Sequence, residues 1–337
     1  MLEQKEEGAF EARLHSKQSV VTLTDLGWSD FFASQFNPGQ DKGFAPARVI
    51  GVARTGLKLS DGKRQFDSKL GNRWYQDSVQ DQPVIGDWVL VNDQLHVTQL
   101  LKRQNVLARI APNTSDKVQS IMANVDTLLV VSSCNQEFNE ARIERFLSLA
   151  SSANVEASIV LTKTDLSKEK KSYLNRAKKL TTNPVHPINA TDLKDCQKLA
   201  TYLKQGKTIS LIGSSGVGKS TIVNALLGQA IQKTQPVRST DDKGVHTTTA
   251  RSLHVVPSGG IIIDSPGVRE IALVEDKMDL RSAFEDIYEL AEQCRFTDCR
   301  HDKEPDCAIR LAVKSGALDG RRLKSFLNLS LQKANQH

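Results

Sequence analysis

The feature that most constrains the fold is a glycine-rich loop, Gly213-Ser214-Ser215-Gly216-Val217-Gly218-Lys219-Ser220, which matches the pattern G-x-x-x-x-G-K-[ST]. The loop follows the apolar run 208–212 and precedes a segment with helical spacing. Between a buried strand and a helix, such a loop turns backbone N–H groups toward phosphate oxygens. The chain therefore needs a parallel α/β sheet. We expect these residues and Thr221 to bind nucleotide phosphates, with Lys219 reaching the β- and γ-phosphates and Ser220 binding Mg²⁺.

A second loop, Thr162-Lys163-Thr164-Asp165, follows the apolar run 157–161 and indicates recognition of guanine. The Asp165 carboxylate can accept from guanine N1–H and the 2-amino group together, which adenine does not offer, and Lys163 can lie over the purine. The first residue of this motif is usually Asn. Thr162 lacks that amide, which normally braces the neighbouring loops, so we expect weaker guanine binding. Asn189 and Ala190 are the best match to the partner loop, with the Ala190 N–H directed at guanine O6.

Two further segments complete the predicted nucleotide site. Asp264-Ser265-Pro266-Gly267 follows the buried run 261–263, where Asp264 can hold Mg²⁺ and the Gly267 N–H can sense the γ-phosphate. Thr247 and Thr248 lie in the polar loop before it and are candidates for the hydroxyl that reaches Mg²⁺ when the γ-phosphate is present. The alternative is that these threonines simply begin a strand. Because the guanine loop precedes the phosphate loop, the order of motifs is circularly permuted.

The catalytic group is harder to assign. A glutamine usually follows D-x-x-G in Ras-like enzymes, and here that position is Val268, which cannot orient water. His246 is the best local substitute, and a purely structural loop histidine is the alternative. We therefore expect His246, Lys219 and Thr248 to contribute to catalysis.

A metal site is predicted near the C-terminus. Cys294, Cys299, His301 and Cys307 have the spacing C-x4-C-x-H-x5-C. Three thiolates and one imidazole complete a tetrahedral Zn²⁺ shell and leave no position for a reactive water. We expect one structural Zn²⁺ that stabilises a small helical module.

The pattern of apolar and polar residues divides the chain into four parts. Residues 1–44 form a polar arm with one short helix, and residues 45–115 have the short alternating strands of an OB-like β-barrel, or of a generic barrel without a nucleic-acid role. Residues 116–275 alternate apolar strands with amphipathic helices, as in a doubly wound α/β domain, and residues 276–337 are helical around the Cys/His cluster.

Charge and composition narrow the function classes. The net charge is +6, of which residues 116–275 carry about +5, and this permits a nucleic-acid partner without requiring one. The sequence has no run long enough to span a membrane, and the start of the chain is acidic and polar rather than signal-like. We expect a cytoplasmic monomer that does not bind membranes.

These motifs together resemble the RsgA (YjeQ) family, the ribosome small-subunit-dependent GTPases. The resemblance covers about residues 45–332 and includes Pro83-Val84-Ile85-Gly86-Asp87, the permuted nucleotide motifs and Gly244-Val245-His246-Thr247-Thr248-Thr249. It also includes the Cys/His pattern with Arg295, Phe296 and Glu304. It implies an OB fold, a permuted GTPase domain and a C-terminal zinc module. It further implies GTP hydrolysis stimulated by the small ribosomal subunit, contact with its rRNA, and a role in late subunit maturation.

Two rival functions remain. One is an RNA-binding, ribosome-associated scaffold whose nucleotide site is weak or vestigial, although the intact Lys219, Ser220 and Asp264 argue against it. The other is an ATPase, and competition between ATP and GTP would separate it from a GTPase.

Overall fold

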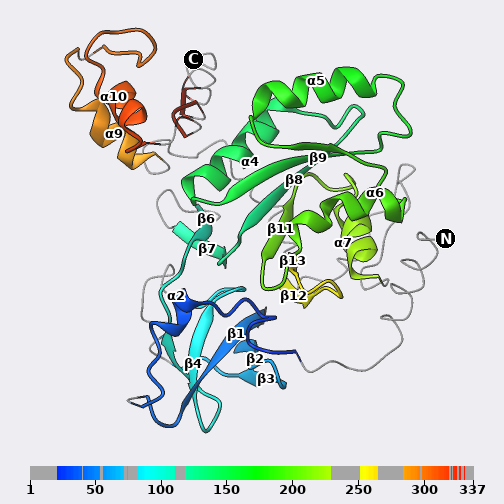
Figure 1. The fold of residues 1–337 in the computed structure, drawn as a ribbon, viewed down its shortest axis with the longest axis vertical. Coiled ribbons are helices and arrows are strands. Elements are labelled where there is room, and N and C mark those ends of the chain that lie inside the picture. Colours follow the sequence, from blue (N-terminus) through cyan, green and yellow to red (C-terminus); the bar gives the residue numbers. More distant parts are fainter. Residues whose placement is uncertain are drawn as a thin grey trace, which may run out of the picture.

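In the computed structural model of the chain, the described residues are 21–39, 41–53, 56–71, 74, 82–110, 118–228, 251–264, 284–296, 298–318, 320, 322–324, 326–327 and 330. Figure 1 shows an α/β part in the middle, a β-rich part below it and a small helical part at the upper left. Within the described residues, no helix is both long and apolar enough to cross a membrane.

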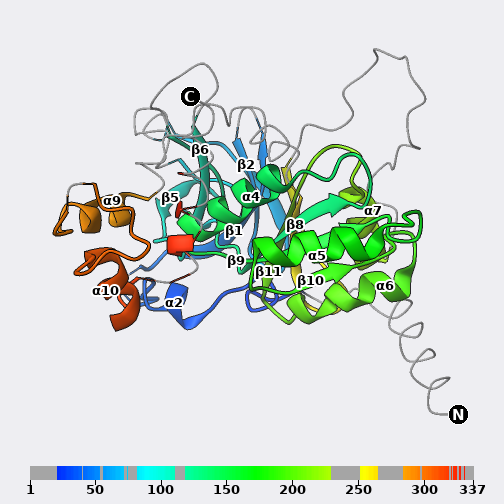
Figure 2. The ribbon, with the colours of Figure 1, turned by 90° about the horizontal axis from the view of Figure 1, so that it is seen from above.

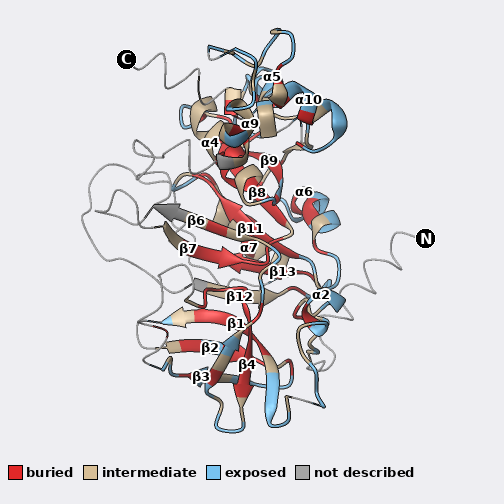
Figure 3. Cartoon of the chain, turned by 90° about the vertical axis from the view of Figure 1, so that its left-hand side faces the viewer, coloured by how far each residue is buried: buried red, intermediate tan, exposed pale blue. Residues whose placement is uncertain are grey.

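The centre of the molecule is a parallel sheet, as the sequence predicted. Its strand order is β10-β9-β8-β11-β13, and each neighbouring pair is parallel. Buried strands of this kind read as continuous apolar runs because both faces are covered. Four of the five strands are buried over most of their length (Figure 3), whereas the edge strand β10 is only partly buried. The five strands are β8 (Thr127–Ser133), β9 (Glu156–Thr162), β10 (Val185–Pro187), β11 (Thr208–Ile212) and β13 (Ile261–Asp264).

Helices cover the two faces of this sheet. Alternate residues of β8 point to opposite sides, so Leu128 packs in one hydrophobic cluster and Leu129 in the other. The first cluster is covered by α4 (Glu140–Ser152) and α5 (Lys170–Leu180). The second is covered by α6 (Leu193–Gln197), the 3₁₀ helix η1 (Lys198–Tyr202) and α7 (Lys219–Leu227).

The β-rich part is an OB-like antiparallel barrel. Its first strand, β1, is long and bends at an irregularity between Val49 and Gly51, so its two halves pair with β4 and β2. The remaining antiparallel pairs are β2 with β3 and β4 with β5. The strands are β1 (Phe44–Ala53), β2 (Gly56–Ser60), β3 (Gln65–Ser68), β4 (Trp88–Asn92) and β5 (Val97–Leu100). A separate hairpin follows, made of β6 (Val106–Ile110) and β7 (Val118–Ala123).

The barrel and the α/β part share one sheet, an arrangement that no local sequence pattern predicted. Strand β12 (Arg251–Val255) pairs antiparallel with β13 on one side and with Gly51 and Val52 of β1 on the other. Among the described residues, eleven strands are thereby joined into one sheet.

Arg48 lies at the seam, the junction between the barrel and the α/β part, and is almost completely buried. Its guanidinium donates to the carbonyls of Leu26, Gly86 and Asn124 and to the Thr208 hydroxyl. Desolvation lowers the pKa of Arg48 to about 10. The side chain therefore ties three segments that are distant in sequence to the start of β11.

Part of the N-terminal arm also packs at this seam. Within the arm, the short helix α2 (Asp30–Ala33) buries Phe32 against Trp88 of β4, with ring centroids 5.8 Å apart. Trp28 contacts the same Trp88 ring edge-on at 4.8 Å. These aromatic contacts bury apolar surface that the barrel would otherwise expose.

The C-terminal helices have a core of their own. Helices α9 (Glu285–Ala291) and α10 (Ala308–Ser315) enclose a cluster that includes Phe284, Ile287 and Ile309. Figures 1 and 2 both place α9 and α10 apart from α6 and α7.

Candidate functional site

The phosphate loop lies at the carboxyl end of β11, where the sequence placed it. Gly213 packs directly on the neighbouring strand, since a Cβ at this position would lie 2.1 Å from the Val131 carbonyl oxygen. Gly218 has φ +101° at the N-cap of α7, a conformation that favours glycine. The Lys219 ammonium lies over the loop and donates to the carbonyls of Gly213 and Ser214, both at 2.6 Å. Ser220 and Thr221 follow in the first turn of α7 and are partly buried.

The guanine loop meets the phosphate loop. Thr162 ends β9, and its Oγ1 donates to the Val217 carbonyl at 2.5 Å and lies 3.3 Å from the Ser132 carbonyl. A Cβ placed on Gly218 would lie 3.6 Å from Thr162 and equally close to Ala190. Three loops therefore converge at one edge of the sheet, and the contact between Thr162 and Val217 joins residues 55 positions apart.

This geometry changes the expectation for Thr162. From the sequence, Thr in place of Asn was expected to remove the brace between the loops. Instead, the hydroxyl itself bridges the two loops, because the end of β9 approaches Val217 closely enough for a short side chain. The reason given for weak guanine binding is thus absent.

The remaining residues of the guanine loop differ in their exposure to solvent. Lys163 has φ +56° and is partly exposed, whereas Thr164 is buried. Asp165 is exposed at the tip, and Leu166 beside it is 77% exposed. The carboxylate and an apolar side chain thus stand open to solvent at the edge where the loops meet.

The partner loop is held by its own polar side chains. The Asn189 carbonyl Oδ1 accepts from the N–H and the hydroxyl of Thr191, and the Asn189 N–H donates to Asp195 at 2.8 Å. The Lys198 ammonium, followed by the Asn189 N–H, lowers the pKa of Asp195. These bonds fix Ala190, which is buried against Gly218.

The structure places Asp264 at the end of β13, next to β11 and partly buried. The carboxyl ends of parallel neighbours meet at one edge, so Asp264 and the phosphate loop share that edge. His246, Thr247, Thr248 and Gly267 lie outside the described residues.

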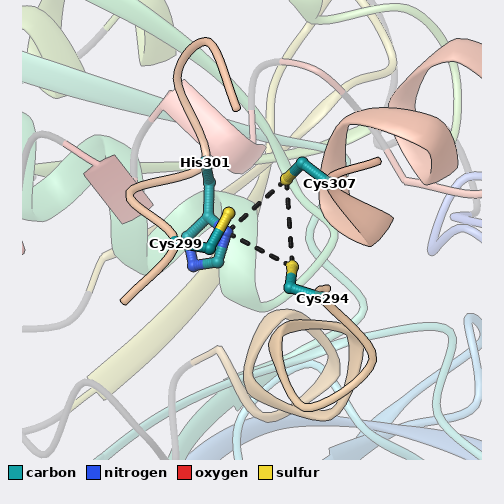
Figure 4. Close-up of side chains that lie close together, drawn as sticks. All are labelled: Cys294, Cys299, His301 and Cys307. Atoms are coloured by element: carbon teal, nitrogen blue, oxygen red, sulfur yellow. Dashed lines mark hydrogen bonds between the residues drawn. The ribbon is translucent and has the colours of Figure 1, made fainter. Parts of the chain in front are cut away.

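The four predicted metal ligands lie together in the C-terminal module (Figure 4). Their ligand atoms all lie within 4.8 Å of one another. The Cys294 and Cys307 sulfurs are 3.9 Å apart, and each lies 3.6 Å from His301 Nδ1. A tetrahedron with Zn–S bonds of about 2.3 Å has edges of about 3.8 Å, so this donor set fits a tetrahedral metal.

Glu304 supports this cluster although it is not one of the four ligands. The Glu304 carboxylate accepts from the backbone N–H groups of Arg300, Asp302 and Lys303 at 3.0–3.1 Å. His301 and Asp306, on either side, have φ values of +62° and +57°. Glu304 therefore holds the tight loop that carries His301 between Cys299 and Cys307.

The fold and the order of the converging loops define a circularly permuted P-loop GTPase. The family model described as "RsgA GTPase" matches residues 100–274. The chain belongs to the RsgA GTPase family, and it is a GTP-hydrolysing enzyme by that membership.

Curated relatives are similar over nearly the whole chain. The "Small ribosomal subunit biogenesis GTPase RsgA 2" of Vibrio vulnificus is 40% identical, over 93% of this chain and 88% of the relative. The "Small ribosomal subunit biogenesis GTPase RsgA" of Mesorhizobium japonicum is 41% identical, over 95% and 91%.

Solved structures support the same fold. The crystal structure of YjeQ from Thermotoga maritima matches with TM-score 0.57 and 23% identity, covering 86% of this chain and 98% of that one. The crystal structure of YloQ, a circularly permuted GTPase, matches with TM-score 0.54 and 21% identity, covering 88% of this chain and 97% of that one.

Proposed function

We propose that this chain hydrolyses GTP during late maturation of the small ribosomal subunit, and that the subunit stimulates the reaction. The observation that carries the proposal is the meeting of Thr162, Ala190 and Gly218 at one edge of the sheet in a member of the RsgA GTPase family. The names of the relatives above point to the subunit as the partner.

In this proposal, the described residues hold each part of the nucleotide. The N–H groups of residues 213–221 surround the phosphates, and Lys219 exchanges its two carbonyl partners for phosphate oxygens. The exposed Asp165 carboxylate binds guanine N1–H and the 2-amino group, while the Ala190 N–H binds O6.

The donor set at this edge also suits Mg²⁺, which prefers oxygen ligands. Ser220 supplies a hydroxyl from α7 and Asp264 a carboxylate from β13. Thr247 or Thr248 would add a hydroxyl, and the Gly267 N–H would contact the γ-phosphate. When bound, Mg²⁺ neutralises charge on the β- and γ-phosphates.

Hydrolysis requires a water molecule to attack the γ-phosphorus while the bond to the β-phosphate oxygen breaks. Val268 cannot orient that water, and we assign the task to His246. The proposed dependence on the subunit follows if binding to the subunit places His246 where it can orient this water.

We assign Zn²⁺ to the Cys294, Cys299, His301 and Cys307 cluster, because three sulfurs and one imidazole nitrogen favour this ion. All four positions of a tetrahedron are filled by protein ligands. The metal therefore stabilises the module and does not activate water.

Helix α5 is the surface that we assign to rRNA. Residues 168–180 contain five lysines, one arginine and one glutamate, a net charge of +5. All five lysines are exposed, and none belongs to an ion pair among the described residues, whereas Arg176 pairs with Glu140 at 2.8 Å. An uncompensated basic face suits the phosphate backbone of RNA. We further propose that the chain is a monomer and works in the cytoplasm.

One experiment tests the function. GTP turnover is measured with increasing small subunits, using Lys219→Ala as the inactive control. We expect turnover to rise with the subunit for the wild type only. Subunit binding without turnover would instead support the RNA-binding scaffold, and equal competition by ATP would support an ATPase.

A second experiment tests the RNA surface. Changing Lys171, Lys178 and Lys179 to Gln should weaken subunit binding and lower its dependence on salt, by a slope of about 0.7–0.9 for each lost phosphate contact. Changing the same lysines to Arg keeps the charge and serves as the matched control. Unchanged binding by the Gln variant would remove α5 from the interface.

A further inference from the structure

Arg142 lies beside the phosphate loop but belongs to none of the nucleotide motifs. It sits in the first turn of α4, where its N–H donates to the N-cap residue Asn139 at 2.9 Å. Helix α4 follows β8, which is the parallel neighbour of β11. The loop that leaves β11 packs on β8 at Val131, so the first turn of α4 is brought to the side of that loop.

The Arg142 guanidinium contacts the loop directly and donates from one of its terminal nitrogens to Ser214 Oγ at 2.5 Å. Lys219 donates to the carbonyls of Gly213 and the same Ser214. Two cations from different helices therefore converge on the first two residues of the loop. Among the described residues, Arg142 forms no ion pair with a carboxylate, so its charge is not neutralised locally.

We propose that Arg142 is a positioning residue for the terminal phosphate of GTP, an inference that rests on the proposed function. Ser215 and Gly216, which follow Ser214, are exposed, and a glycine-rich loop gains order when one side is held. Arg142 holds Ser214 and thereby fixes the direction of the loop N–H groups. It also places a permanent positive charge on the side where negative charge accumulates during phosphoryl transfer.

The need for such a residue is greater in this chain than in Ras-like enzymes. Val268 occupies the position of the water-orienting glutamine. Phosphoryl transfer is catalysed mainly by positioning and by electrostatic stabilisation, and an arginine supplied from within the chain is a known means of providing both. Because Arg142 acts through Ser214, removal of either side chain should affect the same step.

The test uses the full-length chain with Arg142→Ala, Arg142→Lys, Ser214→Ala and the Arg142→Ala/Ser214→Ala double variant. Affinities for GDP and for a non-hydrolysable GTP analogue are measured without the subunit, together with thermal unfolding. The matched control is Arg176→Ala, which removes an arginine whose partner is a carboxylate, Glu140 of α4, and not a residue of the loop.

We expect Arg142→Ala to lose about tenfold more affinity for the GTP analogue than for GDP, and Arg142→Lys to recover part of the loss. The double variant should be no weaker than Arg142→Ala, since coupled residues are not additive. In a GTP turnover assay of Arg142→Ala, the fold decrease in kcat should be larger than the fold increase in KM. Equal losses for both nucleotides, no loss, or additive losses would overturn the proposal. Failure of the wild type itself to bind GTP would count against the proposed function instead.

Discussion

The hydroxyl of Thr162 should be worth about tenfold in nucleotide affinity. Thr162→Val keeps the β-branched shape of this fully buried side chain and removes only the donor to the Val217 carbonyl. A net hydrogen bond contributes about 0.5–1.5 kcal/mol, and a buried acceptor that loses its donor costs about 1–3 kcal/mol. A central value of about 1.4 kcal/mol corresponds to a tenfold change in the dissociation constant.

The measurement is a titration with fluorescent GDP, accompanied by denaturant unfolding of the nucleotide-free chain. Thr127→Val is the matched control, because Thr127 is buried at the start of β8, at the other end of the strands from the loops, and its hydroxyl has no hydrogen bond among the described residues. We expect the control to bind GDP normally. If Thr162→Val binds GDP as tightly as the wild type, the hydroxyl is not the brace between the loops.

Three further outcomes are expected. Asp165→Asn should weaken GTP binding at least tenfold and leave ATP binding unchanged, as measured by competition, because the paired acceptors for guanine are lost; an equal loss for both would contradict the assignment. Glu304→Ala should lower the affinity for the metal about 10–100-fold in a chelator competition, because residues that orient metal ligands have effects of this size. An unchanged affinity would show that the three N–H contacts of the Glu304 carboxylate are dispensable. Burial lowers the pKa of His186 below its ordinary value of 6.5, so the folded chain binds fewer protons there than the unfolded chain, and the free energy of unfolding should fall from about pH 7 to pH 5.5. His186→Gln should show a shallower fall, and an identical slope would refute this.

The sequence was sufficient for the local elements of the site. The apolar runs at 157–161, 208–212 and 261–263 predicted β9, β11 and β13, and the guanine loop, the phosphate loop and Asp264 lie at the carboxyl ends of these strands. This works because strand burial and loop chemistry are encoded within a few neighbouring residues. The positions of His246 and Thr248 stay predictions, as do the domain boundaries at residues 44, 115 and 275.

Long-range contacts could not be predicted in the same way. The pairing of β1 with β12 joins residues about two hundred positions apart, and neither strand has a local pattern that names its partner. Buried Arg48 was likewise invisible, since an isolated arginine in a strand is normally read as a solvent-facing residue. The contact from Arg142 to Ser214 depends on the same kind of tertiary placement.

The shared sheet limits how the protein can be dissected. A shortened chain that began after the barrel would leave β12 without its neighbour β1, and would expose the backbone N–H and C=O groups of Gly51's former partner Ser252. Bare strand edges of this kind recruit other chains. The loss of Arg48 would also leave the carbonyl of Asn124 and the hydroxyl of Thr208 without a donor. Biochemists who want the catalytic half alone should therefore anticipate an aggregating product, and would do better to keep the first strand of the barrel attached.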